Sequence, residues 1–157
     1  MVVLYLDRKF WKNKKVLVIG HTGFIGSWLC LFLNELEANI SGISLPSNFR
    51  LNNFNLSKVK NIMQNSFNTN ILDKKNFKKK LNIIQPEIIF HLAAQPLVIK
   101  SYVKPYTTWE TNVMGTLNVL NEAKKLKKLK SILVVTSDKC YEDKNHKYFF
   151  KETDKLG

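Results

Sequence analysis

The sequence predicts an α/β fold with a doubly wound parallel sheet, because strand patterns and amphipathic helix patterns alternate along the chain. The first strand carries the strongest signal. The apolar run 16–19 suits a strand buried on both faces, and it leads into three glycines with the spacing G-x-x-G-x-x-G. Further strands are expected over 39–45, 62–67, 86–91 and 131–136. Their expected order is 3-2-1-4-5, with ligands outside the carboxyl ends of the strands.

Between these strands, helices are expected over 24–36, 74–84 and 108–125. Asp73 directly precedes the second helix and is expected to act as its N-cap. The first and third helices are expected to carry apolar stripes, formed by Ile25, Trp28, Leu29, Phe32 and Leu36 and by Trp109, Val113, Leu117 and Leu120 respectively. The polar stretch 48–60 is expected to be a loop, and 96–105 an irregular segment between two prolines.

Composition limits the classes of protein that fit. A chain of 157 residues with 45% apolar side chains suits one domain, expected over 1–157, and cannot hold two full ones. Cys30 and Cys140 lie far apart in the sequence, which indicates reduced thiols in a cytoplasmic protein rather than a disulfide scaffold. No metal site is expected, because no ligand spacing links the three histidines, His21, His91 and His146.

The net charge of +13 comes largely from lysines, which cluster over 74–80 and 124–130. These clusters could contact nucleic acid, or they could be solvated helix faces. We favour solvated faces, because the clusters lack arginine and an aromatic platform for stacked bases. No apolar run approaches the ~20 residues of a membrane span, and residues 1–6 lack the features of a signal peptide. We therefore expect neither a nucleic-acid partner nor a membrane.

The glycine-rich turn is the first candidate ligand site. Glycines at this spacing allow a tight turn and let backbone amides approach a pyrophosphate at the positive end of the following helix. With a strand before it and a helix after it, the pattern predicts a Rossmann-like dinucleotide site. An acidic residue that would contact the ribose about 20 positions later is missing. Ser44, Ser47 or backbone groups would replace it, and Arg50 leaves NADP open beside NAD.

Two further strand ends carry candidate residues. Ala93 and Ala94 follow the strand 86–91, where they leave room for a flat cofactor group or simply allow tight packing. After the last strand, Ser137, Asp138 and Lys139 place a hydroxyl, a carboxyl and an amine at the ligand edge. These three side chains could face a substrate lying over the cofactor, or they could cap a turn. The segment 70–73 is expected at the edge of an adenine pocket.

Five segments together resemble the extended short-chain dehydrogenase/reductase family: Phe10-Trp-Lys-Asn-Lys-Lys-Val-Leu-Val18, Gly20-His-Thr-Gly-Phe-Ile-Gly-Ser-Trp-Leu29, His91-Leu-Ala-Ala-Gln-Pro-Leu-Val98, Thr111-Asn-Val-Met-Gly-Thr116 and Val135-Thr-Ser-Asp-Lys-Cys-Tyr-Glu142. Within that family they are similar to the CDP-glucose 4,6-dehydratase subgroup. Lys139 is the discriminating residue, because the related dTDP-glucose dehydratases carry glutamate at its place.

The resemblance implies internal oxidation and reduction of a nucleotide sugar, CDP-glucose or a relative, with bound NAD. Hydride leaves sugar C4, water is eliminated across C5 and C6, and hydride returns to C6 to give a 4-keto-6-deoxy sugar. The resemblance makes Asp138 the acid for the departing hydroxyl and Ser137 a hydrogen-bonding partner of the C4 oxygen. Lys139 would either act as the base or stabilise the developing enolate, and these alternatives stay equal.

The resemblance also implies two sets of ligand contacts. Cofactor contacts fall on Gly20, Gly23, Phe24, Ile25, Gly26, Ile71, Leu92, Ala93, Ala94 and Thr111. Contacts toward the sugar fall on Gln95 and Lys100. The chain departs from the family at Asn70, where aspartate is usual beside the adenine, and at Ile25, which replaces a common lysine.

The family's catalytic Tyr-x-x-x-Lys segment is the largest departure, because neither Tyr141 nor Tyr148 is followed by lysine four residues later. We therefore expect the N-terminal part of such a dehydratase, incomplete at its C-terminal end and truncated before the nucleotide-sugar domain. A homodimer is expected for the full-length family. The alternatives are a non-catalytic dinucleotide-binding fragment and another nucleotide-sugar epimerase or dehydratase of the extended family.

Overall fold

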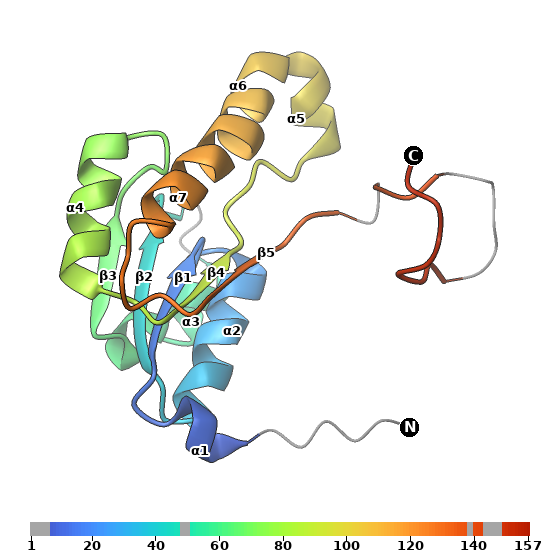
Figure 1. Ribbon diagram of the computed structural model, residues 1–157. Helices are drawn as coiled ribbons and strands as arrows, with labels where there is room; N and C mark the ends of the chain where they lie inside the picture. Colours follow the sequence, from blue (N-terminus) through green and yellow to red (C-terminus); the bar gives the residue numbers. More distant parts are fainter. Residues whose placement is uncertain (1–6, 48–50, 138–139, 143–148) are drawn as a thin grey trace.

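The computed structural model of the protein describes residues 7–47, 51–137, 140–142 and 149–157. One parallel sheet has the order β3-β2-β1-β4-β5, which confirms the predicted topology (Figure 1). Its strands are β1 (Lys15–Ile19), β2 (Asn39–Ser44), β3 (Asn65–Asn68), β4 (Ile88–His91) and β5 (Ser131–Val134). The chain moves from β1 to one side of the sheet and then crosses to the other side with β4. The carboxyl ends of β1 and β4 thus flank the switch point of the fold.

The helices are α1 (Arg8–Trp11), α2 (Phe24–Glu35), α3 (Asn53–Leu56), the 3-10 helix η1 (Val59–Ile62), α4 (Lys74–Ile84), α5 (Val98–Val103), α6 (Pro105–Trp109), the π-helix η2 (Glu110–Gly115) and α7 (Thr116–Ala123). Helices α2, α3 and η1 contact one another on one face of the sheet, and α4 contacts α7 on the other. Among the described residues, no helix is long and apolar enough to cross a membrane.

Strand β1 is buried on both faces, as its apolar run predicts. Leu17 and Ile19 pack with Phe77 on the α4 and α7 face. Val16 and Val18 pack on the opposite face, with α2 and α3, and these four side chains of β1 are 0% exposed. Alternate side chains of one strand therefore build both halves of the core.

Three local predictions need correction. The stretch 48–60 contains α3 and the first half of η1, and the segment 96–105 contains α5. Helices of four to six residues are too short to show a clear period in the sequence. The third strand begins at Asn65 rather than at residue 62, because Ile62 closes η1 and packs into the core.

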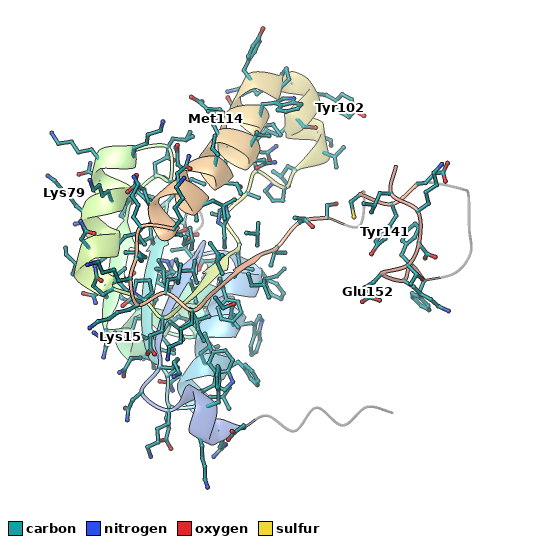
Figure 2. The ribbon with its side chains drawn as sticks, in the orientation of Figure 1. Lys15, Lys79, Tyr102, Met114, Tyr141 and Glu152 are labelled. Atoms are coloured by element: carbon teal, nitrogen blue, oxygen red, sulfur yellow. The ribbon has the colours of Figure 1, made fainter. Side chains whose placement is uncertain are left out.

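The predicted apolar stripes of the two long helices lie mostly outside the core. In the first stripe only Leu29 and Leu36 pack into the core, and all four residues of the second stripe are exposed. In α2, Trp28 is 54% exposed, whereas the buried positions are Gly26, Ser27, Cys30 and Leu33. In the other helix, Trp109 is 68% exposed, and Gly115, Asn118, Val119 and Ala123 are buried. Small residues let both helices approach their neighbours closely, Gly26 at the turn after β1 and Gly115 at Ile71. Tyr102 of α5 and Met114 of η2 are exposed as well, and Figure 2 shows both side chains pointing outward.

The lysines of α4 lie on the face opposite its core contacts. Phe77 and Leu81 are buried, while the lysines at 74, 75, 78 and 79 are exposed. Lys79 points away from the body of the protein in Figure 2. Asp73 caps the helix, because its Oδ1 accepts a hydrogen bond from the Asn76 amide at 3.0 Å. The N-cap prediction is confirmed.

Candidate functional site

The glycine loop begins where β1 ends. Gly20 has φ +94°, a backbone conformation that favours glycine, and its amide donates to the Ile43 carbonyl at 2.8 Å. A Cβ atom at Gly20 would lie only 2.8 Å from the Ala93 nitrogen. Both the backbone conformation and the available space therefore require glycine at this position.

Gly26 brings the start of α2 against this turn. A Cβ atom at Gly26 would overlap the Gly20 carbonyl oxygen, so only glycine permits the approach. Gly23 is the N-cap of the helix and has no side chain that could accept from the first-turn amides. The amides of residues 24–26 also lack acceptors within the helix. Together with the helix dipole, these amides form a cradle that fits a diphosphate.

The segment after β4 lies directly beside the glycine loop. The Leu92 amide donates to the Ile19 carbonyl at 2.8 Å, and Ala93 passes against Gly20. Ala94 is exposed. The structure thus brings the loop 20–26 and the segment 92–94 together at the switch point, as the sequence predicts.

The remaining candidate cofactor contacts occupy several positions around this edge. Phe24 and Ile25 are 72% and 62% exposed on the first turn of α2. Ile71 is only 5% exposed, because it packs in the core against Gly115, and its carbonyl accepts from Asn118 Nδ2 at 3.2 Å. Thr111 is half-buried in η2.

Gln95 is held within the protein. Its amide donates to Asn112 Oδ1 at 2.7 Å, and Asn112 Nδ2 donates back to the Gln95 carbonyl at 3.1 Å. The Gln95 side chain donates to the Leu97 carbonyl and Thr108 Oγ1, each at 3.1 Å, and accepts from the Leu97 amide at 2.8 Å. Gln95 therefore fixes the path of the chain after β4. Lys100 is exposed on α5.

The end of β2 carries hydroxyl groups where many dinucleotide sites have a carboxylate. Thr22 Oγ1 lies 2.7 Å from Ser44 Oγ and donates to the Leu45 carbonyl at 2.9 Å. Ser47 Oγ accepts from Asn52 Nδ2 at 2.6 Å. Arg50, the candidate contact for a 2′-phosphate, lies outside the described residues.

Two buried histidines flank the site. His21 is 1% exposed, and burial lowers its pKa to about 4 although the main chain of Ile43 partly opposes the shift. His91 is 2% exposed, and burial lowers its pKa as well. The Thr116 hydroxyl donates to the Asn112 carbonyl, so His91 Nε2, 3.0 Å away, is the donor to Thr116 Oγ1. Both rings are therefore neutral at pH 7.

The candidate catalytic residues follow β5. Ser137 is exposed, three positions beyond the end of the strand at Val134. Asp138 and Lys139 lie outside the described residues. Because β5 pairs in parallel with β4, Ser137 leaves the sheet at the same edge as the segment 92–94.

Comparison with known proteins identifies the family of this chain. The sequence profile of the GDP-mannose 4,6 dehydratase family matches residues 17–157. The chain belongs to this family. A CDP-glucose 4,6-dehydratase of Salmonella typhimurium is 39% identical over 155 residues, which cover 97% of this chain and 42% of that protein. The chain thus spans less than half the length of this dehydratase relative.

Solved structures of UDP-glucose 4-epimerases share the fold of this chain. The UDP-glucose 4-epimerase of Thermotoga maritima, solved with UDP-glucose, superposes with a TM-score of 0.76 at 27% identity, over 90% of this chain and 44% of that one. The UDP-glucose 4-epimerase of Thermus thermophilus, solved with NAD, gives a TM-score of 0.75 at 24% identity, over 90% and 44% of the two chains. The family's sheet and helices therefore recur in epimerases.

Sequence reasoning missed two residues that support the site of this dehydratase-family chain, His21 and Asn112, and it also missed the buried pair of His91 and Thr116. Their partners lie up to 45 positions away, as between His21 and Ser66. Asn112 carried one local signal, since it stands three residues before a glycine inside a predicted helix. Such a position favours an irregular turn, and η2 is a π-helix there.

Proposed function

We propose that this chain is the N-terminal, NAD-binding part of a CDP-glucose 4,6-dehydratase, a lyase of nucleotide sugars. The observation that carries the proposal is the 39% identity with a CDP-glucose 4,6-dehydratase over 97% of the chain. The glycine cradle between β1 and α2 supports it, because the amides of the first helical turn, which has no side-chain cap, are groups that can donate to a diphosphate. Residues 1–157 form the dinucleotide-binding domain in this proposal.

In this proposal, different residues of the site contact different parts of the dinucleotide. The amides of residues 24–26 donate to the diphosphate, while Gly20 and Gly23 let the backbone come close. Ile71 lies on the adenine side, and the segment 92–94 with Thr111 on the ribose and nicotinamide side. When bound, NAD supplies a hydride acceptor and donor. The epimerase of Thermus thermophilus, solved with NAD, supports this choice of cofactor.

The residues after β5 act on the sugar in this proposal. Ser137 hydrogen-bonds the C4 oxygen, and Asp138 protonates the hydroxyl that departs from C6. Lys139 acts as the base or stabilises the negative charge that develops at the enolate. Lys100 lies toward the sugar, and Gln95 shapes the same wall through its bonds to Asn112 and Leu97. CDP-glucose or a related nucleotide sugar is the substrate.

Two properties complete the proposal. The protein is cytoplasmic, in keeping with the buried free thiol of Cys30 and the free thiol of Cys140. The full-length dehydratase is a homodimer, and it uses neither nucleic acid nor a membrane.

A chimera tests the activity. These 157 residues would replace the matching 42% of the Salmonella typhimurium enzyme, and NMR would follow CDP-glucose in the presence of NAD. We expect the 4-keto-6-deoxy sugar to form, and Asp138→Asn to lower the rate by about 10² or more. A folded, NAD-binding chimera that forms no product would refute the dehydratase assignment.

The alternative activity is epimerisation, which the 27% identity with the Thermotoga maritima epimerase favours. The same chimera given UDP-glucose would then yield UDP-galactose. A non-catalytic dinucleotide-binding fragment is the other alternative, because neither Tyr141 nor Tyr148 is followed by lysine four positions later. For the isolated chain, we expect calorimetry to detect NAD binding and NMR to detect no conversion of CDP-glucose.

A further inference from the structure

The side chain of His21 leaves the glycine loop and enters the core between the sheet and α3. Its Nε2 lies 2.8 Å from Ser66 Oγ on β3, and its ring meets Phe54 edge-on with 5.3 Å between centroids. Gly42 on β2 makes room for the ring, because a Cβ there would overlap the imidazole. One side chain of the loop therefore contacts two neighbouring strands and a helix.

The backbone of His21 contacts the opposite side of the loop. A Cβ atom at Gly26 would lie 2.9 Å from the His21 Cα, so the first turn of α2 rests against this residue. The ring and the backbone of His21 thus connect the start of α2 to β2 and β3. A displacement of the ring would move the backbone that supports the first-turn amides.

Thr22 continues the same attachment. Its hydroxyl lies 2.7 Å from Ser44 Oγ and donates to the Leu45 carbonyl at 2.9 Å, both at the end of β2. Glycine-rich turns lose more conformational freedom on ordering than other turns. The two residues between Gly20 and Gly23 therefore restrict a segment whose glycines would otherwise leave it mobile.

The geometry points to His21 as a positioning residue of the dinucleotide site, which fixes the glycine loop through Ser66 and Gly42 so that the amides of residues 24–26 face the diphosphate before it binds. This inference rests on the proposed dinucleotide-binding function. Such preorganisation increases affinity, because a loop that is already ordered does not have to lose conformational entropy when the ligand binds. A residue that only filled the core would contribute stability and leave the affinity of the folded protein unchanged.

The test compares four variants by calorimetry with ADP and with NAD, well below each melting temperature. His21→Leu removes the polar atom, whereas His21→Gln places an amide nitrogen the same number of bonds from Cα as Nε2. Ser66→Ala removes the partner. Thr116→Val is the matched control, since it deletes the hydroxyl bonded at 3.0 Å to His91, the other buried histidine.

We expect His21→Leu to weaken ADP binding about tenfold and Ser66→Ala to weaken it severalfold. His21→Gln should stay within about threefold of the wild type. Thr116→Val should lower the melting temperature while the ADP affinity stays within about twofold. In the free protein, NMR should show shifted amide signals for residues 20–26 in His21→Leu but not in Thr116→Val.

Equal ADP affinity in wild type and His21→Leu would overturn the inference while the proposed function stands. Equal losses of affinity in His21→Leu and Thr116→Val would also overturn it, because the effect would then follow stability alone. If His21→Leu does not fold, Ser66→Ala and His21→Gln decide, and a Ser66→Ala protein with wild-type affinity refutes the inference. A wild-type chain that binds neither ADP nor NAD would refute the proposed function itself.

Discussion

The carbonyl oxygen of Gly20 occupies the space that a side chain at Gly26 would need, so the turn after β1 and the first turn of α2 meet backbone to backbone at this point. We expect Gly26→Ala to destabilise the fold by about 1–3 kcal/mol, because backbone atoms must shift to admit the Cβ. We also expect calorimetry to show that Gly26→Ala abolishes NAD binding. Gly23→Ala is the control for the loss of stability only, since its Cβ would lie 3.3 Å from the same oxygen at an ordinary φ of −74°. A Gly26→Ala protein that binds NAD like the wild type would contradict the prediction.

The buried His21 predicts that stability falls in mild acid. Its pKa is about 4 in the fold, against the ordinary value of 6.5, so the unfolded chain binds more protons between these values. Stability is therefore full above pH 6.5 and decreases as the pH falls toward 4. The difference between these two pKa values corresponds to a loss of about 3 kcal/mol in the free energy of unfolding once His21 is protonated.

Urea unfolding at pH 7, 6 and 5 checks this decrease. In His21→Gln, the free energy of unfolding should depend less steeply on pH. His91, whose pKa burial also lowers, leaves a residual decrease of stability toward low pH. Identical slopes for wild type and His21→Gln would show that the imidazole of His21 does not titrate as the structure requires.

Gly42 and His21 form a pair whose sizes are matched. Gly42→Ala should cost about 1–3 kcal/mol, because its Cβ overlaps the imidazole ring. In the double variant Gly42→Ala with His21→Ser, that overlap is gone, so the two effects should be less than additive. Denaturant unfolding of the four proteins measures the coupling. Additive losses would mean that the two residues do not share one space.

Asn112 joins η2 to the segment after β4 through two hydrogen bonds with the Gln95 backbone, of 2.7 and 3.1 Å. We expect Asn112→Ala to lower the free energy of unfolding by about 1–3 kcal/mol, because the backbone groups of the buried Gln95 lose their partners. Hydrogen exchange of the Gln95 amide should accelerate. Asn34→Ala, at an exposed helix position, should change neither quantity. Unchanged exchange at Gln95 in the Asn112 variant would contradict the assignment.

The two thiols should differ sharply in reactivity. Burial raises the pKa of Cys30 to about 12, whereas Cys140 is exposed. A disulfide reagent at pH 8 should therefore modify one thiol per native chain quickly and the second only on unfolding. Cys140→Ser should remove the fast reaction. Two fast thiols in the native wild type would contradict the buried position of Cys30.

The sheet could be predicted from the sequence because its strands carry their own signals. The run 16–19 is apolar at every position, and alternation with helices sets the strand order. The neighbourhood of the glycine loop and the segment 92–94 follows from the same topology, since both leave adjacent strands at one edge.

The helix faces and the supporting contacts could not be predicted in this way. Hydrophobic periodicity favoured Trp28 and Trp109 as core residues, yet Gly26 and Gly115 are the buried positions. Gly26 lies against the Gly20 backbone and Gly115 against Ile71, where a larger side chain would not fit. The bond from His21 to Ser66 spans 45 residues and leaves no local pattern. Such contacts become visible only when the strands are placed side by side.

The π-helical turn of η2 sets the rotation between two halves of one long helix. Each residue of an α-helix advances the side chains by about 100°, so a turn with one extra residue offsets everything beyond it. Asn112 can therefore face the Gln95 backbone while Asn118 and Val119 still face the core. Deleting a single residue from 110–115 would restore regular α-helical hydrogen bonding. It would also rotate one half of the helix by about 100° relative to the other, so that only one half could keep its contacts. A regular α-helix in this place could therefore not satisfy both the contact with Gln95 and the contacts with the core.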